Sequence, residues 1–194
     1  MPETRIETPL TADAVRALRA GDSVLLSGVI YTARDAAHQR IVAALETGQD
    51  LPFDLAGQAI YYCGPAPTPP GRAIGSAGPT SSYRMDPYAP LLHSRGLRAS
   101  IGKGDRAVAV RQACLDHGSV YLVAVGGAGA LLADCVTDAE VVAYPELGPE
   151  AVRRLVVRDL PLIVAYDAHG GSVFPGDDPL AARPAGACPR EPSP

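Results

Sequence analysis

The chain has 194 residues and is 47% hydrophobic, which is enough to bury an ordinary core, so we expect one compact domain. Its formal net charge of -4 and the lack of a basic cluster argue against nucleic acid or a membrane surface as a partner. Its apolar stretches are shorter than a bilayer span and no basic-then-apolar leader opens the sequence, so we expect a cytoplasmic protein outside the membrane.

The first third of the chain alternates predicted helices and strands. Thr11 is a favourable helix N-cap, and Gly21 and Gly48 stand where helices commonly end. The apolar run after Gly21 has the composition of a buried strand. The expected elements are a helix at 11–20, a strand at 23–31, a helix at 35–47 and a short strand at 58–63.

A long loop follows. From Gly64 to Pro79, glycine and proline hold more than half of the positions, which excludes both a helix and regular strand pairing. Loops of this length inside a compact domain usually serve function. This one leads to Thr80 and the polar residues behind it, so we expect it to shape a site.

The second half continues the alternation. We expect an α/β layered fold, a mixed sheet with packed helices, over residues 1–174. Residues 175–194 are rich in Pro, Ala and Gly and predict a disordered or loosely packed tail. The expected elements are an interrupted helix reaching 94, a helix at 105–117, a strand at 120–125, a glycine-opened turn and short helix at 126–133, segments at 136–143 and 162–166, and a helical turn at 149–155 that presents Arg153 to solvent.

The four cysteines are Cys63, Cys114, Cys135 and Cys188, and none forms the short Cys-x-x-Cys pair typical of zinc or iron–sulfur sites. Free and mostly buried thiols in a reducing compartment are the expected state.

Positive charge in this chain is almost entirely arginine. Sixteen arginines and the single lysine, Lys103, make up the 17 basic residues. A lone lysine between two glycines suggests a position that needs a compact ammonium, because lysine and arginine differ in shape and hydration. Survival of one lysine by chance is the alternative.

Three segments each set a cation beside a tight turn or a helix start. Arginine binds carboxylates through two parallel hydrogen bonds, lysine adds a point charge, and a helix N-terminus favours anions. Together they predict an anion site. The segments are Tyr-Thr-Ala-Arg-Asp-Ala-Ala-His at 31–38, Gly-Pro-Thr-Ser-Ser-Tyr-Arg-Met-Asp at 78–86 and Ile-Gly-Lys-Gly at 101–104.

In this order, the three segments resemble the C-terminal part of class I fumarases. Two later segments, at 126–132 and 146–151, are similar to the same family, and the resemblance covers about residues 10–174. In two-subunit versions this part is a separate β subunit, which also occurs in L(+)-tartrate dehydratase. The resemblance implies a swivelling β/β/α-type domain. Ser81 departs from the family pattern, where a second threonine is usual, but it keeps the hydroxyl.

The resemblance also implies a partner. An α subunit would hold a [4Fe-4S] cluster through three cysteines, in an α2β2 heterotetramer, while this chain would bind no metal itself. The iron would act as a Lewis acid on the leaving hydroxyl, and a base would remove a proton from the carbon beside the other carboxylate.

By resemblance, Arg34, Arg84 and Lys103 are expected to bind the carboxylates of a small dicarboxylate substrate, with Thr80 as the catalytic base. Cations there would stabilise the negative charge that proton removal pushes onto the carboxylate. A threonine hydroxyl needs an activating neighbour, which the sequence does not identify. Ser81 is carried over as a supporting residue.

Three other residues have open roles. Asp35 could support the site or pair with surface groups, as Arg34 itself could. His38 lies one helical turn beyond Arg34 and could relay protons, although a packed or solvated histidine is commoner. Asp86 could orient Arg84 or cap a turn.

The sequence therefore predicts the β subunit of an iron–sulfur hydro-lyase, with fumarate hydratase, which interconverts (S)-malate and fumarate, as the first reading. The β subunit of L(+)-tartrate dehydratase is the alternative, and a non-catalytic module that binds small anions is the rival from another class. Malate and tartrate differ by one hydroxyl, and the sequence does not identify which of the two is the substrate.

Overall fold

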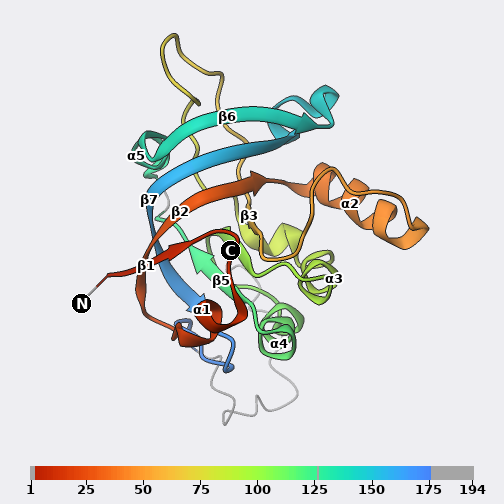
Figure 1. The fold of residues 1–194 in the computed structure, drawn as a ribbon, viewed down its shortest axis with the longest axis vertical. Coiled ribbons are helices and arrows are strands. Elements are labelled where there is room, and N and C mark those ends of the chain that lie inside the picture. Colours follow the sequence, from red (N-terminus) through yellow and green to blue (C-terminus); the bar gives the residue numbers. More distant parts are fainter. Residues whose placement is uncertain (1–2, 126, 176–194) are drawn as a thin grey trace, which may run out of the picture.

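Seven strands and the helices between them form a mixed α/β fold in the computed structural model, which describes residues 3–125 and 127–175 (Figure 1). The strands are β1 (Thr4–Glu7), β2 (Ser23–Thr32), β3 (Ala59–Tyr61), β4 (Ala99–Gly102), β5 (Val120–Val123), β6 (Val136–Ala143) and β7 (Val152–Tyr166). The α-helices are α1 (Ala12–Ala17), α2 (Asp35–Thr47), α3 (Ala89–Ser94), α4 (Val108–His117) and α5 (Gly129–Asp134), and the short 3-10 helices are η1 (Ser82–Met85) and η2 (Pro145–Glu150).

The sheet closes on itself through its longest strand. Strands β1 to β5 run parallel in the order β1-β2-β3-β4-β5. The 15-residue β7 is antiparallel to β5, β6 and β2, so that β2, β3, β4, β5 and β7 form a ring. Each strand of the ring therefore pairs with a neighbouring strand on both sides. Because β2, β3 and β4 are parallel neighbours, their carboxyl ends lie next to one another.

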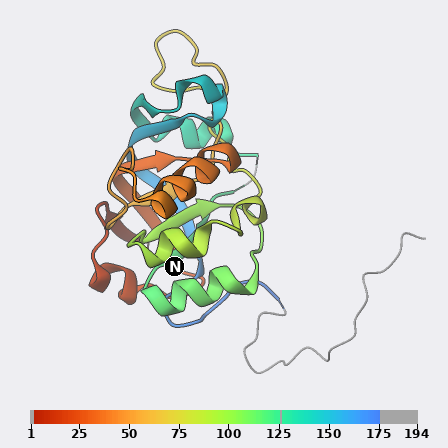
Figure 2. The same cartoon turned by 90° about the vertical axis from the view of Figure 1, so that its right-hand side faces the viewer.

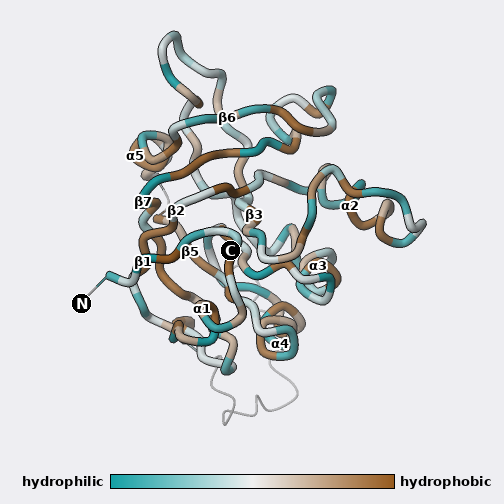
Figure 3. Tube along the Cα trace, in the orientation of Figure 1, coloured by the Kyte–Doolittle hydropathy of each residue, from teal (hydrophilic) through white to brown (hydrophobic). Residues whose placement is uncertain are grey.

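Side chains of the parallel strands face two cores. Along β3, Ala59 and Tyr61 belong to the core enclosed by the sheet, whereas Ile60 and the following Tyr62 belong to a second core with Ile41 of α2 and other helix residues. Helices α2, α3 and α4 lie along this second face (Figures 1 and 2). Hydrophobic stretches run along β5 and β7 inside the molecule (Figure 3). The alternation of side chains along the strands thus directs one face of the sheet to an enclosed core and the other face to a core shared with helices.

The sequence predicted helix α2 correctly. It runs over Asp35–Thr47 and ends at Gly48. The left-handed φ of 68° at Gly48 allows its amide to donate to the carbonyls of Ala44 and Leu45. Thr11 caps α1 as expected, accepting a hydrogen bond from the Ala14 amide at 3.1 Å. This helix ends at Ala17 rather than at residue 20, because Leu18 is already extended.

Two other predictions were wrong. The helical turn expected at 149–155 is absent: η2 ends at Glu150, and Val152 begins β7. This segment is a strand that pairs with β2 on one side and β6 on the other, and it buries Val152, Leu155 and Val157.

The N-terminal strand β1 was not predicted. The helix expected from residue 105 begins at Val108, because Gly104 takes a left-handed φ of 79° and Arg106 turns inward.

Of the described residues, none belongs to a helix long and apolar enough to cross a membrane. Apart from Pro175, the tail predicted at 175–194, with Cys188, lies outside the described residues.

Candidate active site

Three polar segments meet at the carboxyl edge of the parallel strands. Arg34 follows β2 closely and Lys103 follows β4 directly. Between them, the Thr80 amide donates to the carbonyl of Tyr62, just beyond β3, at 2.7 Å. Ligands of α/β proteins usually bind at this edge of a sheet. Segments far apart in sequence therefore lie together at a place suited to a ligand. We call Arg34, Arg84 and Lys103 with their loops the cation edge.

The two arginines share the Asp35 carboxylate. Arg84 Nη2 lies 2.5 Å from Asp35 Oδ2, and Arg34 Nη2 lies 3.7 Å from the same oxygen. Arg34 Nη2 also lies 3.2 Å from Glu150 Oε1, and Glu150 Oε2 accepts a hydrogen bond from the Ala36 amide in the first turn of α2. The side chains of Arg34 and Arg84 are 21% and 43% exposed, so a ligand can still reach both cations.

Several buried polar atoms at this helix start have no hydrogen-bond partner among the described residues. They are Arg34 Nε, both carboxylate oxygens of Asp35, and Nε2 of His38. The Asp35 ion pairs are thus close charge contacts without hydrogen-bond geometry. Buried polar atoms are nearly always paired, since an unpaired one costs about 1–3 kcal/mol. The start of α2 therefore has hydrogen-bonding capacity that the described protein atoms leave unused.

Backbone bonds join Lys103 to the segment that carries Thr80. Ser81 and Lys103 form a parallel bridge, and the Ser82 amide donates to the Lys103 carbonyl at 3.1 Å. The Lys103 amide donates in turn to Ser82 Oγ at 3.0 Å. Among the described residues, no carboxylate lies within ion-pair distance of the Lys103 ammonium. Lys103 thus contributes a positive charge that these neighbours do not neutralise.

Gly102 allows this close approach. A Cβ at this position would collide with Ser82 Oγ and come within 2.9 Å of Tyr62 Cδ2. The Tyr121 hydroxyl lies 2.9 Å from Ser82 Oγ and donates to the Gly104 carbonyl at 2.7 Å. The glycine before Lys103 is therefore a packing requirement, and a buried hydroxyl network holds the two loops in register.

Asp86 pairs with Arg106 and not with Arg84. Its Oδ1 lies 2.5 Å from Arg106 Nε, and its Oδ2 accepts a hydrogen bond from the Ala107 amide at 2.7 Å. The Arg106 guanidinium is fully buried and lies 5.1 and 4.9 Å from the ring centres of Tyr62 and Tyr121. Asp86 therefore binds the N-cap of α4 and anchors the segment after η1 to the loop after Lys103.

His38 is buried beneath the cation edge. Its Nδ1 donates to the Arg34 carbonyl at 2.9 Å, and its ring packs against Tyr62 and Tyr88. Burial lowers the pKa of His38 to about 4, with the Arg34 carbonyl opposing and the Arg106 charge assisting the shift. The ring is therefore neutral near pH 7 and fixes the backbone at Arg34, which fits a packed histidine.

Sequence reasoning missed Glu150, Ser82 and Arg106 as site residues. Glu150 belongs to the 146–151 segment that carried part of the resemblance, so a signal for it was present. Ser82 lies inside the second motif, but no sequence signal shows that this serine is buried and bonded to the Lys103 amide. Arg106 follows the third motif by two residues, and nothing in a sequence distinguishes a buried arginine from the many exposed ones.

The three cysteines in the described part of the chain do not fit an iron–sulfur cluster. Cys63 lies in the main core and Cys114 in a separate cluster with Tyr121 and Tyr166. Burial raises the pKa of Cys63 to about 12 and that of Cys114 to about 11, whereas cluster ligands are thiolates. Cys135 is partly exposed and, like the other two, free. Within 3–125 and 127–175, no three His, Cys, Asp or Glu residues are grouped to hold a metal ion.

Comparison with known proteins assigns the family. The sequence model of the family described as "Fumarase C-terminus" matches residues 2–176. A Geobacillus stearothermophilus protein named "Putative fumarate hydratase class I" is 40% identical over 173 residues, 87% of this chain and 33% of that protein. The Escherichia coli "Fumarate hydratase class I, anaerobic" is 42% identical over 151 residues, 77% of this chain and 28% of that protein.

A third relative is a short protein. The Methanocaldococcus jannaschii "Putative L(+)-tartrate dehydratase subunit beta" is 42% identical over 171 residues, which cover 85% of this chain and 88% of that protein. The chain thus spans about a third of the fumarase relatives, 33% and 28% of the two above, and nearly the whole of this one. Since the family match extends over almost the entire sequence, the chain belongs to the fumarase C-terminus family, as its motifs predicted.

Proposed function

We propose that this chain is the β subunit of a hydro-lyase that interconverts (S)-malate and fumarate. The observation that carries the proposal is the cation edge, where Arg34, Arg84 and Lys103 come from three separate segments to one edge of the sheet. Three cations beside a helix start suit a doubly negative substrate. The mixed sheet, which antiparallel β7 closes and which packs against helices on one face, supports the swivelling β/β/α-type domain that the family resemblance implies.

In this proposal the cations act on the transition state. Removal of a proton beside a carboxylate moves negative charge onto that carboxylate, so the cations bind it more strongly as the reaction proceeds. Asp35 and Glu150 hold the two guanidinium groups in place before substrate arrives. Such fixed charges need little reorganisation during the reaction, which is the main advantage of a built site.

Thr80 is the proposed base, carried over from the family motif. It is half-buried and its amide is fixed to the Tyr62 carbonyl. Its neighbour Ser81 forms a backbone bridge with Lys103, which brings the segment of Thr80 beside the segment that carries the lysine. A nearby cation favours the deprotonated form of a hydroxyl, which makes Lys103 the candidate for the activating group.

A larger α subunit completes the enzyme in this proposal. It supplies three cysteines that hold a [4Fe-4S] cluster, because Cys63, Cys114 and Cys135 of this chain do not fit one. The relatives support the arrangement, since one is a β subunit by name and the others are about three times longer than the matched region. We propose an α2β2 complex in the cytoplasm, where reduced thiols are the rule.

Tartrate dehydratase is the second candidate, and the β-subunit relative of similar length favours it. Its substrate, tartrate, differs from malate by one hydroxyl. The test is to purify the chain with the larger polypeptide from the same genome, reconstitute the cluster anaerobically, and assay malate, fumarate and tartrate. We expect turnover of malate and fumarate by the complex and none by the chain alone. Turnover of tartrate only would select the second candidate, and binding of dicarboxylates without turnover of any would select the non-catalytic anion-binding module.

A further inference from the structure

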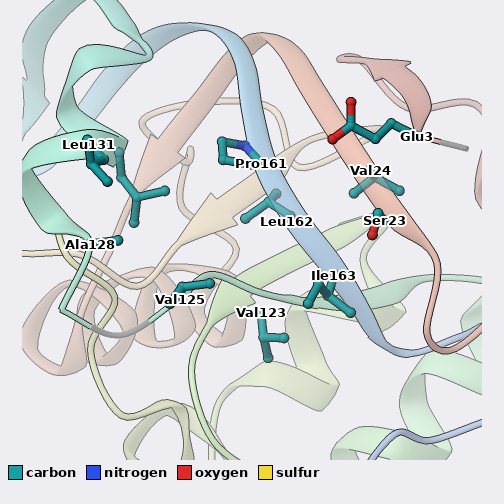
Figure 4. A pocket seen from close by; sticks show the side chains of 11 residues that line it. Glu3, Ser23, Val24, Val123, Val125, Ala128, Leu131, Pro161, Leu162 and Ile163 are labelled. Carbon is teal, nitrogen blue, oxygen red and sulfur yellow. The ribbon is translucent and has the colours of Figure 1, made fainter. Parts of the chain in front are cut away.

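A groove with a volume of about 390 Å³ lies between α5 and strands β2, β5 and β7 (Figure 4). Apart from Glu3 and Ser23, every residue that lines it is apolar. Leu132 and Leu162, which contribute to it, are each only 3% exposed and belong to the main core. The groove therefore rests on a packed base that holds its shape.

Three large apolar side chains on this groove face solvent. Val125 is 66% exposed, Leu131 is 70% exposed and Ile163 is 38% exposed. They come from the segment after β5, from α5 and from β7, so they gather on the surface only in the folded chain. A contiguous exposed apolar surface in a folded protein usually marks a contact with another polypeptide.

The position of the N-terminal residues indicates which polypeptide covers the groove. Glu3, the first described residue, lines the groove, and β1 begins at Thr4 (Figures 1 and 4). The family is the C-terminal part of fumarases, and the match covers only 33% and 28% of the two fumarases compared above. The family match begins at residue 2, so the preceding part of such a longer protein would join this region next to Glu3, beside the groove.

One wall of the groove packs against the loop that leads to the candidate active site. The Ala77 amide donates to the Gly129 carbonyl at 2.9 Å, at the start of α5. A Cβ added at Gly78 would lie 3.6 Å from the Gly129 Cα. The wall formed by 128–132 thus packs on the loop that leads to Thr80. A polypeptide seated in the groove would lie against the support of the proposed base.

We infer that this groove is the docking surface for an apolar segment of the polypeptide that corresponds to the preceding part of the longer fumarases. That polypeptide is the separate α subunit of the proposed enzyme. The inference rests on the proposed function only in taking this polypeptide as the one that completes the enzyme.

The test is association, measured separately from activity. The full chain and the purified larger polypeptide are titrated by calorimetry without oxygen, with Leu131→Asp as the groove variant and Val108→Asp as the control. Val108 is 79% exposed at the start of α4 and does not line the groove. Loss of a buried leucine contact and burial of a charge should raise the Kd of Leu131→Asp roughly tenfold to a hundredfold. Val108→Asp should bind like the wild-type chain.

Other outcomes would overturn the inference. An unchanged Kd for Leu131→Asp in an active complex would refute the groove assignment and leave the proposed function intact. A wild-type chain that does not associate at all would refute both. Light scattering that finds a homodimer dissociated by Leu131→Asp would identify a second copy as the occupant. Binding of an apolar-surface dye only after deletion of residues 176–194 would identify that segment instead.

Discussion

The cation edge and the apolar groove are connected through the loop before Thr80, which packs on the start of α5, but they are built in opposite ways. At the cation edge, charged side chains are fixed by ion pairs with Asp35 and Glu150 and by the buried Asp86–Arg106 pair beneath. In the groove, exposed Leu131 and Val125 stand on a packed apolar floor. Internal charge pairing fits a surface that positions charges for a small ion. Exposed apolar side chains fit a surface that another polypeptide covers.

The largest effect is expected from breaking the support of the cation edge. Asp86→Asn leaves the fully buried Arg106 guanidinium without its counter-charge, and removal of one partner of a buried pair costs about 3–5 kcal/mol. Urea unfolding should show this loss in the free energy of unfolding. The exposed pair of Arg5 and Asp159 is the control, where Asp159→Asn should cost less than about 1 kcal/mol. Equal losses in the two variants would refute the anchoring role of Asp86.

Burial of His38 in the first turn of α2 should make the stability of the chain depend on pH. The pKa of His38 is about 4 in the folded chain against 6.5 for an unperturbed histidine, so between these values only the unfolded chain takes up the proton. This contribution to stability is therefore complete above pH 6.5 and falls as the pH is lowered towards 4. Between pH 7 and pH 4.5 it amounts to roughly 2–3 kcal/mol.

The matched variant is His38→Gln. Its free energy of unfolding should decline less over this pH range than that of the wild-type chain, and His93, whose pKa is also lowered to about 3 by burial, accounts for part of the remainder. Parallel pH dependences of wild type and variant would show that His38 is not buried neutral.

Substitutions of the cations test the edge itself. Arg34→Lys and Arg84→Lys keep the charge but lose the paired hydrogen bonds, and Lys103→Arg enlarges the head group between two glycines. Each should lower kcat/KM of the reconstituted complex about tenfold to a hundredfold or more. Arg95→Lys is the control, because Arg95 is exposed and precedes β4, whereas Lys103 follows it. Activity equal to that of Arg95→Lys would refute the carboxylate-binding role.

Arg153 would not serve as this control. It was expected on an exposed helical turn, but it lies on β7, and its guanidinium donates to the carbonyls of Gly148, Pro149 and Ala151. Its replacement would disturb the segment that carries Glu150.

The smallest effect is expected from truncation outside both regions. Deletion of residues 176–194 should leave association and kcat/KM within twofold of the full chain, since a segment rich in Pro, Ala and Gly can bury little apolar surface. Calorimetry and the malate assay measure both quantities. A lost complex would make this segment part of the interface.

Local signals explain what the sequence could predict. The caps and periodicity of α2 and the motifs around Arg34, Thr80 and Lys103 are contiguous in sequence, so helix, loops and family could be identified without a structure. The first part of strand β7 could not, because its pairing with β2 and β6 depends on partners distant in the chain, and only its end at 162–166 was expected as an element. The roles of Glu150 and Arg106 likewise exist only through contacts between distant segments.

The most direct measurement compares one variant from each region in the same reconstituted complex. Arg84→Lys should associate with the wild-type Kd and lose at least about tenfold in kcat/KM, because its exposed guanidinium acts on the substrate. Leu131→Asp should associate more weakly but reach the wild-type kcat once the larger polypeptide is saturating. Wild-type kcat/KM in Arg84→Lys, or a kcat for Leu131→Asp that stays low at saturation, would contradict the division between a charged catalytic edge and an apolar docking groove.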